Sequence, residues 1–204
     1  SGTTHGHLPQ MLLIWLLPLY ILNLYSDRYI SEYNRGYINI MLMKTGRLRY
    51  ILTKMAASFI IPFTVMLGCL LINFGLAHII YRGGYTFHGL EVLTYSEVNT
   101  FMVTHGNLTY CIYMLMTCFT VGCCGVICQC IAMLVKKYAH TYIAGFLVWM
   151  ALVIANAKFT IINLIQPFTA YELDKPIPSF VLLTLLTLSV LLLTVLIKRK
   201  RDEL

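Results

Sequence analysis

The segment SDRYISEYNRGYINIMLMKTGRLRYILTK, residues 26–54, decides the fold because it is a charged, amphipathic stretch between two long apolar runs. If the residues before the Thr45-Gly46 break form a helix, the i, i+3, i+7 rule divides their side chains between two faces. The apolar face carries Ile30, Tyr33, Tyr37, Ile40 and Met41, whereas Arg28, Glu32, Arg35 and Asn39 fall elsewhere. The pattern predicts a helix at a membrane surface, with one face for lipid headgroups or neighbouring helices and the other for water or a partner protein.

Basic residues surround the Thr45-Gly46 break in this segment and lead into the next apolar run. They are Lys44, Arg47, Arg49 and Lys54. Short loops on the cytoplasmic side of a membrane are rich in lysine and arginine. We therefore expect residues 26–54 to be cytoplasmic.

The composition of the chain is that of an integral membrane protein. Of its 204 residues 59% are hydrophobic and 11% charged, with a mean hydropathy of +0.76. Soluble domains carry about 25% charged residues. The net charge of +7 comes from basic residues beside apolar runs, which predicts contact with a lipid bilayer and no nucleic-acid partner.

Apolar runs at five places are each long enough to cross a hydrocarbon core of ~30 Å, which takes about 20 helical residues. They span residues 8–25, 50–80, 107–135, 138–156 and 180–197. Of the 15 lysines and arginines, all except Arg82, Lys158 and Lys175 fall on the side of residues 26–54. We expect one transmembrane domain over residues 1–204, all-α, with five visible transmembrane helices and a cytoplasmic C-terminus.

Small side chains in the membrane runs predict close helix packing. The third run holds Gly122, Gly125 and the thiols of Cys123, Cys124 and Cys128, and the second holds Gly68 and Gly75. Small residues let helix backbones approach one another in lipid. A metal or redox site is the alternative, but no histidine or acidic residue lies near these cysteines in the sequence.

Two segments are predicted on the outer side. Residues 82–105 read as a solvated loop, whereas residues 157–180 are too apolar for a free loop and are broken by prolines. The second segment predicts a short re-entrant helix before the last span. Its residues Leu164, Pro167 and Phe168 are our candidates for an outer gate.

The cytoplasmic segment resembles that of the permease subunits of type-2 ABC exporters. The resemblance rests on Glu32, Gly36, Leu42, Lys44, Gly46, Arg47 and Lys54. It implies that this amphipathic segment is a coupling helix docking on an ATP-hydrolysing subunit, with Glu32, Arg35, Gly36, Leu42, Arg47 and Lys54 as ATPase-coupling residues. The short re-entrant outer helix agrees with the same family.

The resemblance implies a whole assembly. A second permease subunit, identical or different, and ATP-binding cassette ATPase subunits would be the partners, with ATP and Mg bound in the ATPase and no cofactor in this chain. The complex would export a hydrophobic or amphipathic peptide, lipid or drug across the plasma membrane. Family permeases have six spans, so an N-terminal tail and a first helix would precede this sequence.

Catalytic and nucleotide-binding motifs are absent from the sequence. It has no Walker-type loop, no G-x-S-x-G, no H-E-x-x-H and no C-x-x-C pair. A permease without its own ATPase fits this absence. The alternatives are an intramembrane enzyme, for which Asp27, Glu32 and His140 are the candidates, and a channel or sensor subunit without an ATPase.

Overall fold

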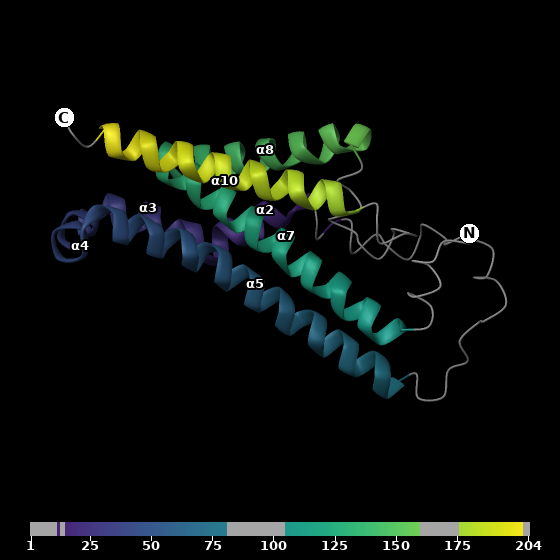
Figure 1. Ribbon diagram of the computed structural model, residues 1–204. Coiled ribbons are helices and arrows are strands. Elements are labelled where there is room, and N and C mark those ends of the chain that lie inside the picture. Colours follow the sequence, from purple (N-terminus) through teal and green to yellow (C-terminus); the bar gives the residue numbers. More distant parts are fainter. Residues whose placement is uncertain (1–11, 13–14, 81–104, 160–175, 202–204) are drawn as a thin grey trace.

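The computed structural model describes residues 12, 15–80, 105–159 and 176–201, and these residues are helical or lie in turns between helices (Figure 1). The predicted all-α class is confirmed. The helices are α2 (Leu17–Ile21), η2 (Leu22–Ser26), α3 (Asp27–Asn34), α4 (Tyr37–Thr45), α5 (Arg47–Ile80), α7 (Gly106–Val135), α8 (Tyr138–Phe159) and α10 (Pro176–Arg201).

Helix α7 is the centre of the bundle. Its most apolar stretch is 78% buried, whereas those of α5 and α10 are 17% buried. Helices α2, α5, α8 and α10 all pack against α7. Because α5 and α10 are apolar and face outward over most of their surface, they are suited to contact lipid.

Three of the described helices are long and apolar enough to cross a membrane: 47–80, 107–135 and 180–198. The predicted fourth span forms α8, in which the apolar stretch Tyr138–Leu152 is shorter. Of the predicted first span, only residue 12 and residues from 15 onward are described. The prediction of five spans is thus supported for three helices.

Two helices approach each other closely where α5 passes α7. A Cβ added to Gly125 would lie 2.1 Å from the Ser58 carbonyl oxygen, and one added to Gly122 would lie 2.7 Å from the Phe59 ring. Pro62 has no N–H to donate to the carbonyl of Ser58, four residues earlier, so the proline leaves this oxygen without its helical partner. The prediction that Gly122 and Gly125 permit close packing is confirmed.

The other pair of glycines does not pack against any of the described residues. A Cβ on Gly68 or Gly75 would meet nothing within 4 Å. The sequence pattern was misleading here because a small residue marks a close contact only where a second helix faces it.

The predicted surface helix is interrupted at Gly36 and is wrong in this respect, whereas the break predicted at Thr45-Gly46 is confirmed. Gly36 has φ +70° and Gly46 φ +77°, so the chain turns at both and forms α3, α4 and the first residues of α5. Left-handed φ values end a helix and favour glycine. Residues on the two sides of Gly36 therefore do not share the predicted apolar face. Ile30 is fully buried, whereas Tyr37 and Ile40 are exposed.

The segments predicted on the outer side lie mostly outside the described residues. Helix α8 continues to Phe159 and α10 begins at Pro176, so each takes part of the predicted segment 157–180. The gate candidates Leu164, Pro167 and Phe168 and residues 82–104 fall in the ranges that the structure does not describe.

Candidate functional site

One end of the bundle carries most of the charged residues that the structure describes, and we call it the charged end. Figure 1 shows α3 and α4 at the same end as the last turns of α10. The turn between α7 and α8 also reaches it, because Lys136 contacts α3. The chain reverses there at Lys136, whose φ of 61° ends α7. Basic residues that are far apart in the sequence thus meet around α3.

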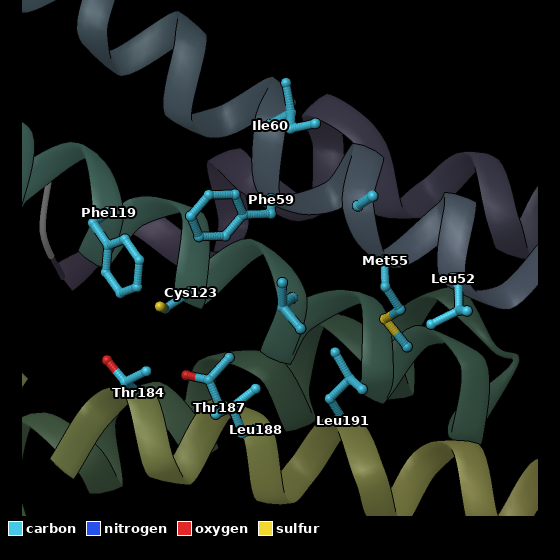
Figure 2. A pocket seen from close by; sticks show the side chains of 12 residues that line it. Leu52, Met55, Phe59, Ile60, Phe119, Cys123, Thr184, Thr187, Leu188 and Leu191 are labelled. Atoms are coloured by element: carbon cyan, nitrogen blue, oxygen red, sulfur yellow. The ribbon is translucent and has the colours of Figure 1, made fainter. Parts of the chain in front are cut away.

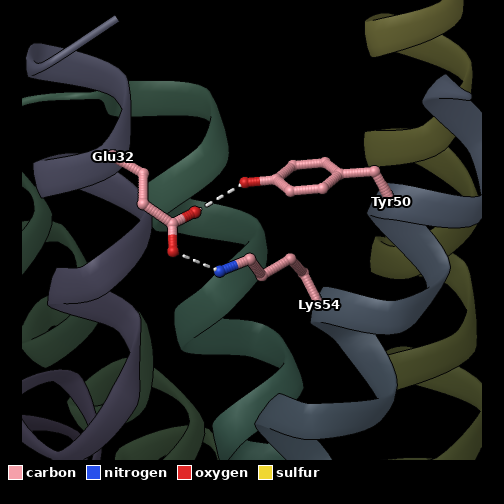
Figure 3. Close-up of polar contacts among 3 residues, drawn as sticks. All are labelled: Glu32, Tyr50 and Lys54. Atoms are coloured by element: carbon pink, nitrogen blue, oxygen red, sulfur yellow. Dashed lines mark hydrogen bonds and ion pairs between the residues drawn. The ribbon is translucent and has the colours of Figure 1, made fainter. Parts of the chain in front are cut away.

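The carboxylate of Glu32 is bonded to α5 by both oxygens (Figure 3). Lys54 Nζ donates to Oε1 at 2.7 Å, and Tyr50 Oη donates to Oε2 at 2.8 Å. The side chains of Lys54 and Glu32 are only 15% and 26% exposed. Because the pair is largely shielded from water, its attraction is stronger than that of a surface ion pair, and the loss of one partner would leave a poorly solvated charge.

The ammonium group of Lys54 also lies beside two aromatic rings. Its Nζ is 5.7 Å from the centre of the Tyr25 ring and 5.6 Å from that of Tyr50. A cation at this distance is attracted to the negative face of a ring. Lys54 thereby connects η2, α3 and α5.

Further polar contacts connect α3 to the other helices. Tyr142 Oη of α8 donates to Asp27 Oδ2 at 2.6 Å. Lys136 Nζ donates to Tyr33 Oη at 3.1 Å and lies 4.3 Å from the centre of that ring. Together with the Glu32 contacts, these bonds would make α3 move with α5 and α8 as one body.

Helix α10 is connected to α3 in the same way. Lys198 Nζ donates to Tyr29 Oη at 3.3 Å and lies 5.9 Å from the centre of its ring. Tyr29 is buried and packs with Tyr50, Met55 and Met133. The polar contacts of Tyr29 and Tyr50 are therefore backed by a buried apolar cluster of α3, α5 and α7. We call α3 with its partners Tyr50, Lys54, Lys136, Tyr142 and Lys198 the α3 hub.

Four buried polar atoms have no hydrogen-bond partner among the described residues. They are Ser26 Oγ, Asp27 Oδ1 and both amide atoms of Gln129. Ser26 directly precedes α3 and Asp27 begins it, whereas Gln129 lies in α7 one residue before Cys130, which belongs to the same apolar cluster as Tyr29. A buried polar group without a partner costs free energy, and a polar residue among apolar helices is a candidate for a functional role.

The outer face of α4 is apolar and exposed. Tyr37, Ile40 and Met43 are 48%, 49% and 82% exposed, whereas Ile38 is buried against α5. We call Tyr37, Ile40 and Met43 the α4 face. Figure 1 shows α4 at the charged end, and the exposed residue Arg35 lies two residues before Tyr37 in the sequence.

The predicted coupling residues are thus in two groups. Glu32 and Lys54 are bonded to each other within the chain, and Leu42 is half-buried against α5. Arg35, Gly36 and Arg47 are exposed at the charged end. The reason for glycine at position 36 is its backbone conformation, since a Cβ there would meet nothing within 4 Å.

Several hub residues escaped the sequence reasoning. Tyr50 could have been found, because it lies four residues before Lys54 and therefore on the same face of a helix. The pairing of Asp27 with Tyr142 has no such local pattern. His140, a candidate for the enzyme alternative, is exposed.

The fold and the hub define the class of this protein: an all-helical protein built on helices able to span a membrane, with a basic helical segment bound to one end. The chain belongs to the family of the uncharacterized protein YybM of Bacillus subtilis (strain 168). It is 33% identical to that protein over 205 residues, which cover 100% of this chain and 81% of the relative. No protein-family model and no solved structure matches the chain.

Proposed function

We propose that this chain is the permease subunit of an ABC exporter, in which the segment containing α3 and α4 couples the membrane helices to a separate ATPase. The observation that carries the proposal is the division of this segment into an exposed α4 face and a hub bonded to α5, α8 and α10. Coupling requires an exposed surface that binds the ATPase and rigid contacts that transmit the movement of the ATPase to the membrane helices.

In the proposed mechanism the ATPase contacts the α4 face and Arg35, and the hub carries the movement to the membrane helices. Glu32, which we first expected to meet the ATPase, instead joins α3 to α5 through Lys54. Nucleotide binding can shift the permease between two states only as far as the ATPase binds one state more tightly. A difference of about 1.4 kcal/mol changes the ratio of the states tenfold.

The proposed complex contains two permease subunits, identical or different, and two ATPases that bind ATP and Mg. It would lie in the plasma membrane with the charged end and the C-terminus in the cytoplasm and with six spans in each permease. The exported substrate would be a hydrophobic or amphipathic peptide, lipid or drug. Residues 157–180, with Leu164, Pro167 and Phe168, would form its outer gate.

The test is purification in mild detergent with the matched variants Arg35→Glu and Lys137→Glu. Both residues are exposed at the charged end, and both changes reverse one charge. Arg35→Glu should lower the amount of copurified ATPase about tenfold or more, while Lys137→Glu leaves it unchanged. Purification without any ATPase, or equal losses in both variants, would contradict the proposal and favour a channel or sensor subunit.

A further inference from the structure

A groove runs along α7 between α5 and α10 (Figure 2). Its volume is about 390 Å³. Among the residues that line it are Met55, Phe59, Phe119, Cys123, Thr187 and Leu188. Figure 2 shows Met55 and Phe59 on one side and Thr187 and Leu188 on the other, with Cys123 between them.

The walls of the groove offer few groups to a polar ligand. Its hydroxyl groups belong to Thr184 and Thr187, which donate to the carbonyl oxygens of Phe180 and Leu183 in their own helix at 2.8 and 2.7 Å. The other lining side chains are hydrocarbon, sulfur or aromatic. An apolar chain is therefore the occupant that these walls favour.

The groove opens between two of the helices that can span a membrane. Leu52 and Ile60 on the α5 edge and Leu188 on the α10 edge are at least half exposed. In a bilayer these edges contact acyl chains. A chain of a neighbouring lipid can enter the groove sideways without crossing any polar surface.

Two basic residues lie beyond the groove, on the side of the charged end. Arg49 lies one turn before Leu52 on the same side of α5, and Lys198 lies two turns after Leu191 on the same side of α10. Arg49 is exposed, and Lys198 is half-buried beside Tyr29. A basic rim at the end of an apolar groove is complementary to a phospholipid with an anionic headgroup.

We infer that the groove holds an acyl chain of an anionic phospholipid whose headgroup binds Arg49 and Lys198. This inference does not depend on the proposed transport function; it depends only on a membrane location. The bound lipid would fill the space between α5 and α10 and hold both helices on α7.

The test uses fluorescence quenching by phospholipids with brominated chains, in bilayer discs that contain the whole protein. A tryptophan is introduced as Leu188→Trp in the groove or as Leu193→Trp on the opposite, exposed face of α10, and the emission of the parent protein is subtracted. Brominated phosphatidylglycerol should quench Leu188→Trp at a lower mole fraction than brominated phosphatidylcholine. Leu193→Trp should be quenched equally by both lipids.

Removal of the rim cations should abolish this preference. Arg49→Gln and Lys198→Gln should each weaken the preference for phosphatidylglycerol at Leu188→Trp about fivefold. In the protein without an introduced tryptophan, native mass spectrometry should detect a retained anionic phospholipid that the doubly substituted variant loses.

Three results would overturn the inference. Equal quenching of Leu188→Trp by both lipids would show a groove without headgroup selectivity. Quenching of Leu193→Trp alone would show that a protein helix, such as one from a second copy, fills the groove. Retention of the same lipid by the Arg49→Gln/Lys198→Gln variant would place the headgroup elsewhere.

Discussion

Replacement of Gly125 by alanine tests the packing of α5 on α7 directly. The new Cβ would lie 2.1 Å from the Ser58 carbonyl oxygen and 3.1 Å from Cγ of Pro62. Carbon and carbonyl oxygen come no closer than about 3.3 Å even in favourable contacts, so the helices must separate by about 1.2 Å. Since the oxygen belongs to the backbone, no side-chain rotation relieves the overlap, and we expect a loss near the upper end of the ~1–3 kcal/mol typical of overpacked cores.

Gly68→Ala is the matched control for this change. Both glycines lie within helices, and alanine gains about 1 kcal/mol of helix propensity at either position. The Cβ at position 68 meets nothing within 4 Å. The difference between the variants therefore isolates the overlap and should be about 3 kcal/mol, measured by unfolding in mixed micelles of dodecyl maltoside and dodecyl sulfate with far-UV circular dichroism. A difference below about 1 kcal/mol would refute the described approach of α5 and α7.

The α3 hub and the turns beside it lead to further predictions, all measured by the same unfolding assay. A double-mutant cycle of Glu32→Gln and Lys54→Met should give a coupling energy of about 1–3 kcal/mol, between the values for exposed and buried pairs; a coupling below ~0.5 kcal/mol would contradict the ion pair. Gln129→Leu should stabilise the protein by about 1–2 kcal/mol, because it removes a buried amide that has no partner among the described residues; a loss of stability would mean that the amide is bonded. Gly36→Ala should destabilise it by about 1–2 kcal/mol and Gly36→Asn by less, since asparagine tolerates φ +70°; equal effects would show that the turn is not the cause.

The elements that the sequence predicted well depend on local patterns. Long apolar runs predicted the helices, because backbone N–H and C=O groups in an apolar environment must form hydrogen bonds within the segment. The small residues Gly122 and Gly125 gave the close packing of α7, and Lys136 and Lys137 gave the tight turn that follows it. The polar break at Gly46 also appears where the sequence placed it.

The parts that could not be predicted depend on which segments meet. Gly36 was identified, but as an ATPase-coupling residue, because a sequence does not show whether a glycine is needed for a contact or for its backbone angle. Glu32 was expected to face a partner protein, yet its bond to Lys54 forms only because α4 brings α5 back beside α3. The contact between Asp27 and Tyr142 joins positions too far apart for any helical spacing to indicate.

The π-helical turn η2, Leu22–Ser26, joins α2 directly to α3 and so sets the rotation of α3 about the helix axis relative to α2. An α-helix turns about 100° per residue. A deletion or insertion of one residue within η2 would therefore rotate α3 by about that angle relative to α2, and Glu32 would point away from Lys54. Homologous chains should keep the length of this turn more strictly than its side chains, and where the length differs, the acidic and aromatic residues of α3 should be shifted by the same step.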